Sequence, residues 1–151
     1  MTTQTETVFH TIQAPRIITE QRMRDLLCTA FEGGMSSQWA LYADCEIRDG
    51  LTIEDFQEGG SEAVKVSEYS PSHHLIPFVE GCTLIMEDIE DVDDDGKPTL
   101  YRLDRAAMIR GLELMAEKHS RHFNDFMEEN DDAITGDVWL QLACMGEVVY
   151  G

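Results

Sequence analysis

Apolar residues recur at helical spacing soon after residue 19. The residues of this apolar face follow the i, i+3, i+4, i+7, i+8 pattern and are Met23, Leu26, Leu27, Ala30 and Phe31. Thr19 precedes them in the place of an N-cap, and Gly33-Gly34 follows them as a stop signal. The pattern therefore predicts an amphipathic helix that begins after Thr19 and ends at Gly33.

Two short apolar runs farther along the chain are typical of β-strands. They are TLIMEDI at residues 83–89 and LYRL at residues 100–103, and Asp93-Asp94-Asp95-Gly96 between them has turn chemistry. The pair predicts a β-hairpin. The segment QWALYADCEI at residues 38–47 fits either a strand or a short helix.

Three further helices are predicted in the last third of the chain. Asp104 is the expected N-cap of a helix that runs to about Lys118, and a short helix follows Ser120. Thr135 is the expected N-cap of the last helix, which ends at Gly146. The sum predicts an α+β fold with three to four helices on a small antiparallel sheet.

The remaining segments give weaker patterns. We predict that residues 1–17 form an N-terminal arm, which is either frayed or an edge strand. Residues 18–151 are predicted to form a single α+β domain. Residues 49–74 read as a long surface excursion with a helical turn at 53–57. A specialised role could lie within residues 40–80.

Composition narrows the class of partner. The 151 residues include 30 acids and 11 bases, so the formal net charge is −19. A charge of this sign disfavours direct binding to nucleic-acid phosphates and to anionic lipid. No apolar run approaches the length of a membrane span, and the N-terminus does not resemble a signal peptide. We therefore expect a cytoplasmic protein, and its four scattered cysteines read as reduced, mostly buried thiols.

Residues 91–96 (DVDDDG) resemble the first half of an EF-hand calcium loop. Asp91, Asp93 and Asp95 occupy its first, third and fifth positions. Arg102 stands where the loop needs a bidentate Glu, and Pro98 stands at the eighth position. The match is therefore incomplete. We interpret the segment as a solvated turn, and a non-EF calcium site is the alternative.

His119, His122 and Asp125 are a second candidate for metal binding. Two histidines three residues apart share a helix face, and such pairs bind zinc. They equally suit the negative end of a helix dipole without a metal. The sequence contains no nucleophile elbow, phosphate-binding loop or dinucleotide fingerprint, so no catalytic residue and no cofactor are predicted.

Acidic residues form two dense blocks. The residues of these blocks, which we predict to contact a partner, are Glu87, Asp88, Glu90, Asp91, Asp93, Asp94 and Asp95 in the hairpin and Glu128, Glu129, Asp131 and Asp132 before the last helix. A solvated surface is one explanation of such blocks. The other is that the acidic faces imitate nucleic-acid phosphates and occupy a basic groove.

Four segments together resemble a widespread family of small, mostly uncharacterised proteins of bacteriophages and prophages. They are TAFEGG at 29–34 with Trp39 shortly after, GCTLIMED at 81–88, GLELMAEKH at 111–119 and TGDVWLQLACMGEVVYG at 135–151. The resemblance implies no catalytic residues. It implies a phage-encoded protein acting in the cytoplasm of the host bacterium, where small acidic phage proteins often disarm host immunity.

The leading functional hypothesis is a non-enzymatic acidic protein that inhibits a host defence complex, as anti-CRISPR proteins and DNA mimics do, by occupying a basic nucleic-acid-binding surface. The alternative is a sponge that sequesters a nucleotide second messenger in a homo-oligomeric pocket built with Arg102, Arg105 and Arg110. A second alternative is a metal-dependent hydrolase using His119, His122 and Asp125.

Overall fold

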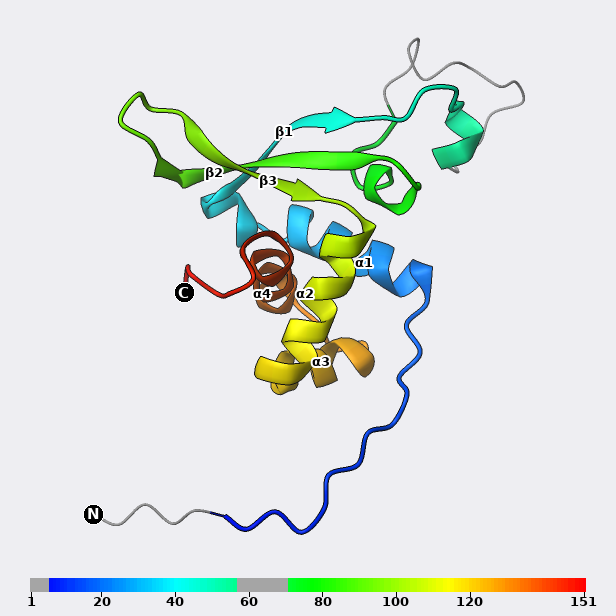
Figure 1. The fold of residues 1–151 in the computed structure, drawn as a ribbon, viewed down its shortest axis with the longest axis vertical. Coiled ribbons are helices and arrows are strands. Elements are labelled where there is room, and N and C mark those ends of the chain that lie inside the picture. Colours follow the sequence, from blue (N-terminus) through cyan, green and yellow to red (C-terminus); the bar gives the residue numbers. More distant parts are fainter. Residues whose placement is uncertain (1–5, 57–70) are drawn as a thin grey trace.

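The computed structural model describes residues 6–56 and 71–151. Within these ranges, four α-helices pack on a three-stranded antiparallel sheet (Figure 1). The predicted α+β class, helix number and acidic hairpin are confirmed. No helix in these ranges combines the length and the apolar content needed to cross a membrane.

The first predicted helix is present as α1 (Glu20–Glu32). The Thr19 hydroxyl accepts a hydrogen bond from the backbone N–H of Arg22 at 3.2 Å, as an N-cap does. Gly33 is the C-cap, and Gly34 follows it with a φ of +86°, which a residue with a side chain rarely adopts. The capping signals therefore fixed both helix ends in the predicted places.

The sheet consists of β1 (Ala40–Glu46), β2 (Thr83–Val92) and β3 (Pro98–Leu103), with β2 in the centre. Residues 38–47 thus contribute a strand, one of the two possibilities left open by their sequence. Leu84 and Met86 of β2 are buried toward the helices, which lie together on one side of the sheet (Figure 1). On the outer face, Glu87 pairs with Leu41 of β1 and with Leu100 of β3.

The last three helices are α2 (Arg105–Lys118), α3 (Ser120–Met127) and α4 (Ala133–Met145). Asp104 caps α2 as predicted, accepting from the backbone N–H of Ala107 at 2.9 Å. The predicted cap of α4 is wrong, because Asp132 occupies that place and accepts from Thr135 N at 3.0 Å. Thr135 lies one turn inside, and its hydroxyl is 3.0 Å from Nδ1 of His122.

One core joins the helices to the sheet. Its largest fully buried side chains include Trp39, Trp139, Phe56 and Phe126. Gly136 of α4 lies so close to α1 that an added Cβ would be 2.9 Å from the backbone nitrogen of Ala30. The missing side chain at Gly136 therefore allows the two helices to lie this close together.

The remaining segments are irregular. Short 3₁₀-helices cover Ser36–Gln38 (η1), Ile53–Phe56 (η2) and Ile76–Phe78 (η4), and the second of these includes most of the turn predicted at 53–57. Residues 57–70 of the predicted excursion lie outside the described residues. The described part of the predicted arm, residues 6–17, has no helix or strand and extends away from the body (Figure 1). The four cysteines are free thiols, and Cys82 is buried whereas Cys28, Cys45 and Cys144 are half-buried.

Candidate functional site

The acidic hairpin ends in a turn that its own carboxylates hold in place. The backbone N–H of Asp93 donates to the carbonyl of Lys97 at 2.9 Å, and Oδ1 of Asp93 accepts from the N–H groups of Asp95 at 2.9 Å and Lys97 at 2.8 Å. Gly96 supplies the positive φ of +79° that closes the turn. The tip is therefore a hydrogen-bonded structure rather than a loose run of charges.

Five exposed acidic residues, here called the hairpin carboxylates, line this tip. They are Glu90, Asp91, Asp93, Asp94 and Asp95. Asp91 accepts from the Thr99 hydroxyl at 2.9 Å. Among the described residues, the carboxylates of Glu90, Asp94 and Asp95 have no hydrogen-bond or ion-pair partner. Lys97 is the single base between residues 89 and 97, so these charges are directed to solvent without compensation.

Exposed apolar side chains accompany the carboxylates. Ile89 and Val92 of β2 and Leu100 of β3 are each exposed, and Leu41 is exposed beside them on the outer face of the sheet. Glu87, predicted as a contact residue, is half-buried between Leu41 and Leu100. The hairpin thus offers both charge and apolar area to a partner.

Asp88, another predicted contact residue, is fully buried. It accepts hydrogen bonds from the Tyr150 hydroxyl at 2.9 Å, the Tyr101 hydroxyl at 3.2 Å and the Glu90 N–H at 3.1 Å. Desolvation and the neighbouring Asp88 carboxylate raise the pKa of Tyr101 and of Tyr150 to about 12. Asp88 therefore organises the interior and cannot contact a partner at the surface.

The second acidic block divides in the same way. Glu128 and Glu129 are exposed, whereas Asp131 is nearly buried and forms an ion pair with Arg22 at 2.9 Å. Asp132 is exposed, and its hydrogen bonds to the first turn of α4 lower the pKa of its carboxyl group. The block connects α3 to α4, at the end of the helical layer remote from the sheet (Figure 1). The two blocks therefore do not form one continuous surface.

The candidate metal ligands do not converge in the described part of the chain. No group of three His, Cys, Asp or Glu side chains there is arranged to hold an ion. His119 is the junction residue between α2 and α3, and the ring of His122 is engaged with Thr135. The predicted shared helix face is therefore interrupted. In the EF-hand-like segment, Asp91 and Asp93 already accept hydrogen bonds from hairpin groups.

The three arginines proposed for a nucleotide sponge point to different places. Arg102 pairs with Glu46 across the outer face of the sheet at 2.8 Å, and Arg110 donates to the carbonyl of Ala143 at 2.8 Å. Arg105 lines a cavity between α1 and α2. They do not form one anion-binding pocket.

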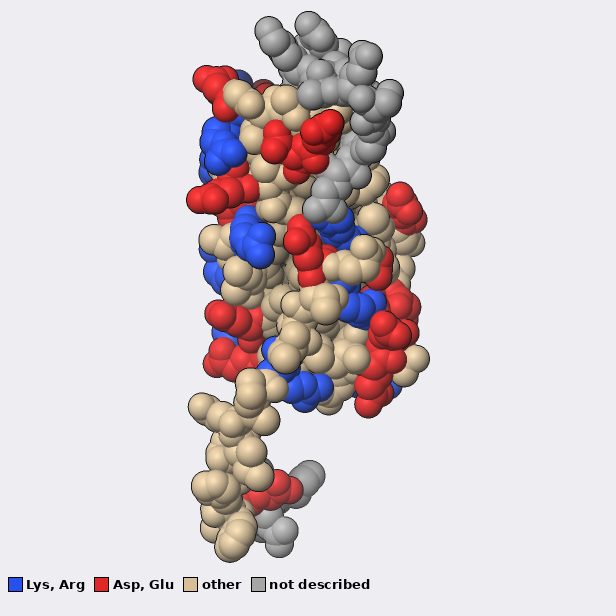
Figure 2. All heavy atoms as spheres, turned by 90° about the vertical axis from the view of Figure 1, so that its right-hand side faces the viewer, with Lys and Arg blue, Asp and Glu red and all other residues tan. Residues whose placement is uncertain are grey.

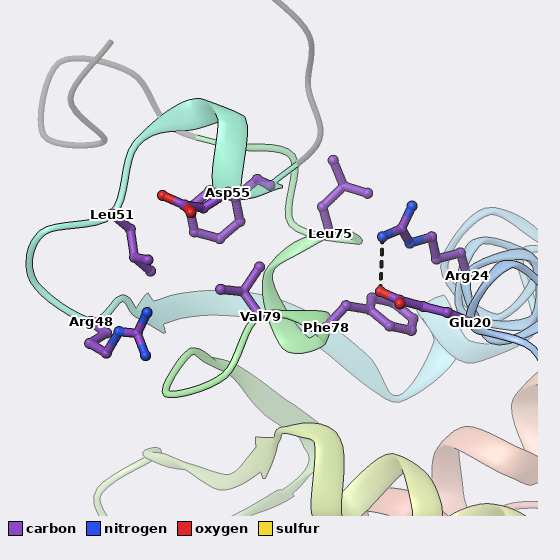
Figure 3. Close-up of a pocket in the computed structure, with 9 residues that line it drawn as sticks. Glu20, Arg24, Arg48, Leu51, Asp55, Leu75, Phe78 and Val79 are labelled. Carbon is purple, nitrogen blue, oxygen red and sulfur yellow. Dashed lines mark hydrogen bonds and ion pairs between the residues drawn. The ribbon is translucent and has the colours of Figure 1, made fainter. Parts of the chain in front are cut away.

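A different pocket of about 260 Å³ lies between α1, the loop after β1 and η4 (Figure 3). Arg24 and Arg48 approach it from opposite sides. Arg24 is paired with Glu20 at 2.9 Å, and Asp55, which also lines the pocket, accepts from Thr52 N at 2.7 Å. The described lining therefore carries two cations and two carboxylates, with no excess of either charge.

The C-terminal block contains a buried polar cluster that was not predicted from the sequence. The Asp137 carboxylate accepts from Trp39 Nε1 at 2.7 Å, Ser36 Oγ at 2.9 Å and Gln141 Nε2 at 2.9 Å. Gln141 Oε1 in turn accepts from Tyr150 N at 2.8 Å and so fixes the chain end beside Asp88. The available signal was the i, i+4 pair of polar residues inside an otherwise apolar helix.

Comparison of the chain with protein-family models, curated proteins and solved structures found no match. The resemblance to phage proteins therefore stays a prediction. The hairpin carboxylates, with the apolar residues beside them, are the candidate functional site on geometric grounds.

Proposed function

We propose that the protein is a non-enzymatic binding module that uses its acidic hairpin to occupy a basic, nucleic-acid-binding surface of a partner protein. The observation that carries the proposal is the set of five exposed hairpin carboxylates on a hydrogen-bonded turn, accompanied by one lysine. A basic groove that normally receives phosphates presents the complementary charge.

The hydrogen-bonded order of the hairpin turn favours binding of a partner. The Asp93 side chain holds two backbone N–H groups of the turn, so the turn does not have to become ordered on binding. Because less conformational entropy is lost, more of the interaction energy is available as affinity. The uncompensated charge also speeds the encounter with a basic partner.

The apolar neighbours favour a protein partner over a bound ion. Ile89, Val92 and Leu100 are exposed next to the carboxylates. Apolar anchors within a charged rim are typical of protein interfaces, where they supply affinity that exposed ion pairs do not. A cation site would instead need carboxylates that converge on one point.

The resemblance to phage proteins suggests the kind of partner. On this proposal, the partner is a nucleoprotein complex of a host defence system, as for anti-CRISPR proteins and DNA mimics. The described residues do not form a site for either of the other two functions. The arginines considered for a nucleotide sponge lie apart, and the candidate metal ligands of a hydrolase do not converge.

The proposal is tested by affinity capture from a bacterial lysate at about 50 mM and about 200 mM salt, because charge-driven contacts weaken over this range. We expect the wild-type chain to capture a basic, nucleic-acid-binding protein at low salt. The variant Glu90→Lys/Asp94→Lys/Asp95→Lys should lose it, since these three carboxylates have no role in the turn. The captured protein should also fail to bind its nucleic acid when the wild-type chain is present.

The matched control is Glu54→Lys/Glu113→Lys/Glu117→Lys. It changes the net charge by the same amount at exposed positions on η2 and α2, away from the hairpin. This control should capture the partner as the wild type does. Equal capture by the hairpin variant would refute the proposal, and equal loss in both variants would assign the effect to net charge alone.

A further inference from the structure

The N-terminal arm carries large apolar side chains that stay exposed among the residues that the structure describes. Here the arm means residues 6–17, which are exposed throughout and have no helix or strand. Its large apolar residues are Val8, Phe9, Ile12 and Ile17, of which Phe9 is fully exposed and Ile12 is 81% exposed. Soluble chains rarely leave so many large apolar groups together in water.

The arm is also unlike the rest of the chain in charge. Residues 7–19 contain no Asp or Glu, although the whole chain has 30, and they include His10 and Arg16. Figure 2 shows the arm as a mostly tan extension below a body marked with red and blue. Residues 7–17 of the arm, which carry no acid, meet no charge repulsion from a surface whose net charge is strongly negative. The body of this same protein is such a surface.

A cavity lined by six apolar residues and by the charged residues Arg16, Glu20 and Arg105 lies where the arm joins the body. It has a volume of about 310 Å³, in the range of pockets that enclose a ligand. Its lining comes from the arm root, α1, η4 and α2, and its apolar residues are Ile18, Met23, Phe78, Met108, Ile109 and Leu112. Ile109 is 47% exposed at this site. Met23, Phe78, Met108 and Leu112 are buried at its base, so Ile18 and Ile109 supply the apolar area that an arm side chain could contact.

The arm's own direction keeps it out of this cavity. Arg16 lines the cavity, and its guanidinium carbon lies 5.8 Å from the centroid of the Phe123 ring on α3, which anchors the root. Beyond that point the arm runs away from the body (Figure 1). Residues 6–17 reach about 40 Å when extended, which is enough to cross to a neighbouring molecule.

We propose that the arm of one copy inserts into the cavity of a second copy, and that the second copy's arm does the same in return. Phe9 and Ile12 are the anchors, and the cavity between α1, α2 and η4 receives them. Because each copy carries its arm beside its cavity, a two-fold axis satisfies both contacts at once and closes the assembly as a dimer. The contact uses neither the hairpin nor its carboxylates.

The test is the molar mass of the full-length chain by size exclusion with light scattering. The wild type should have twice the mass of one chain. The variant Phe9→Asp/Ile12→Asp should have the mass of one chain, because an aspartate pair cannot be buried in an apolar cavity without a large desolvation penalty. Thr7→Asp/Gln13→Asp makes the same change in charge on the same arm and should remain a dimer.

The receiving cavity is tested with a second matched pair. Ile109→Asp should also give single chains, whereas Ile134→Asp should remain dimeric, since Ile134 is 50% exposed but does not line the cavity. Both residues are exposed, and circular dichroism checks that each variant is folded. A monomeric wild type, or a dimer that survives Phe9→Asp/Ile12→Asp, would overturn the proposal. A dimer lost with the arm variant but kept in Ile109→Asp would overturn the assignment of the cavity.

Discussion

Individual aspartates in this protein have different roles, because the backbone directs some of their side chains into the core and others into solvent. Asp88 follows Leu84 and Met86 on the inward face of β2, and so it is buried with two tyrosine hydroxyls. Asp94, only six residues farther on, is exposed in the turn. The first stabilises the fold, and we propose that the second serves binding.

This difference predicts unequal effects on stability. Asp88→Ala removes the acceptor of two tyrosine hydroxyls and should lower the free energy of unfolding by about 2–3 kcal/mol. Asp94→Ala removes an exposed side chain without a partner and should change it by less than about 0.5 kcal/mol. Urea unfolding of both variants measures this, and equal effects would show that Asp88 has no special role in the interior.

The same cluster predicts how stability depends on alkaline pH. Desolvation and the Asp88 carboxylate raise the pKa of Tyr150 from its usual value of 10.0 to about 12 in the folded protein. A raised pKa means that the contribution of the neutral hydroxyl is complete below pH 10 and is lost as the pH rises to about 12. The free energy of unfolding should therefore fall across this range.

The variant Tyr150→Phe isolates this contribution. It should be less stable than the wild type at neutral pH, because it lacks the hydrogen bond of 2.9 Å to Asp88, and it should lose less stability between pH 10 and about 12. Urea unfolding at a series of pH values measures both effects. Parallel pH profiles for the two proteins would contradict the assignment.

Residues such as Asp88 mark the limit of reading this sequence alone. The two-residue period of a β-strand places Leu84, Met86 and Asp88 on one face of segment 83–89. The surrounding acids nevertheless made Asp88 look like part of a solvated block. Its partners Tyr101 and Tyr150 are distant in the chain, so their hydroxyl groups could not be assigned to it without the tertiary structure.

The helices and strands were more predictable than the single residues. Thr19 and Asp104 have capping side chains directly before an apolar stripe, and both cap the helix that follows. The start of α4 was misplaced because Asp132 and Thr135 are both good N-caps three residues apart. Asp132 makes the capping hydrogen bonds, and the Thr135 hydroxyl lies instead 3.0 Å from Nδ1 of His122 on another helix.

The cap of α4 gives a prediction for this element. Asp132→Ala should cost about 1 kcal/mol of stability, because the carboxylate accepts from the N–H groups of Ile134 and Thr135 at 3.0 Å. Those bonds lower the pKa of Asp132, so its contribution is present above the ordinary carboxyl pKa and is lost as the pH falls. Thermal unfolding at neutral and acidic pH measures this, and the difference between variant and wild type should shrink in acid.

Over the whole molecule, the acidic residues that give the net charge of −19 have several different structural roles. Asp88 and Asp137 are buried acceptors, Asp132 caps a helix, and Asp131 holds Arg22. What remains uncompensated in the hairpin is a small set of carboxylates next to exposed apolar residues. The arm has the opposite character, since it is apolar and free of acids between residues 7 and 19.

Composition predicted the existence of an acidic surface but could not locate it fully. Seven acids between residues 87 and 95 suggested one contact set, yet Asp88 is interior and Asp93 is committed to the turn. The second block at 128–132 lies at the other end of the fold. The distance between the two blocks depends on how the elements pack, so it cannot be predicted from a local sequence pattern.

The salt dependence of affinity for the captured partner tests the role of the hairpin carboxylates. Glu90→Gln/Asp94→Asn/Asp95→Asn removes three charges and keeps the side-chain shapes. At low salt it should weaken binding by about 5-fold to 150-fold, from about 0.3–1 kcal/mol for each exposed contact. The plot of log affinity against log salt should also be shallower than for the wild type, so that the two proteins converge at high salt. Identical affinities and identical slopes would contradict a binding function for the hairpin.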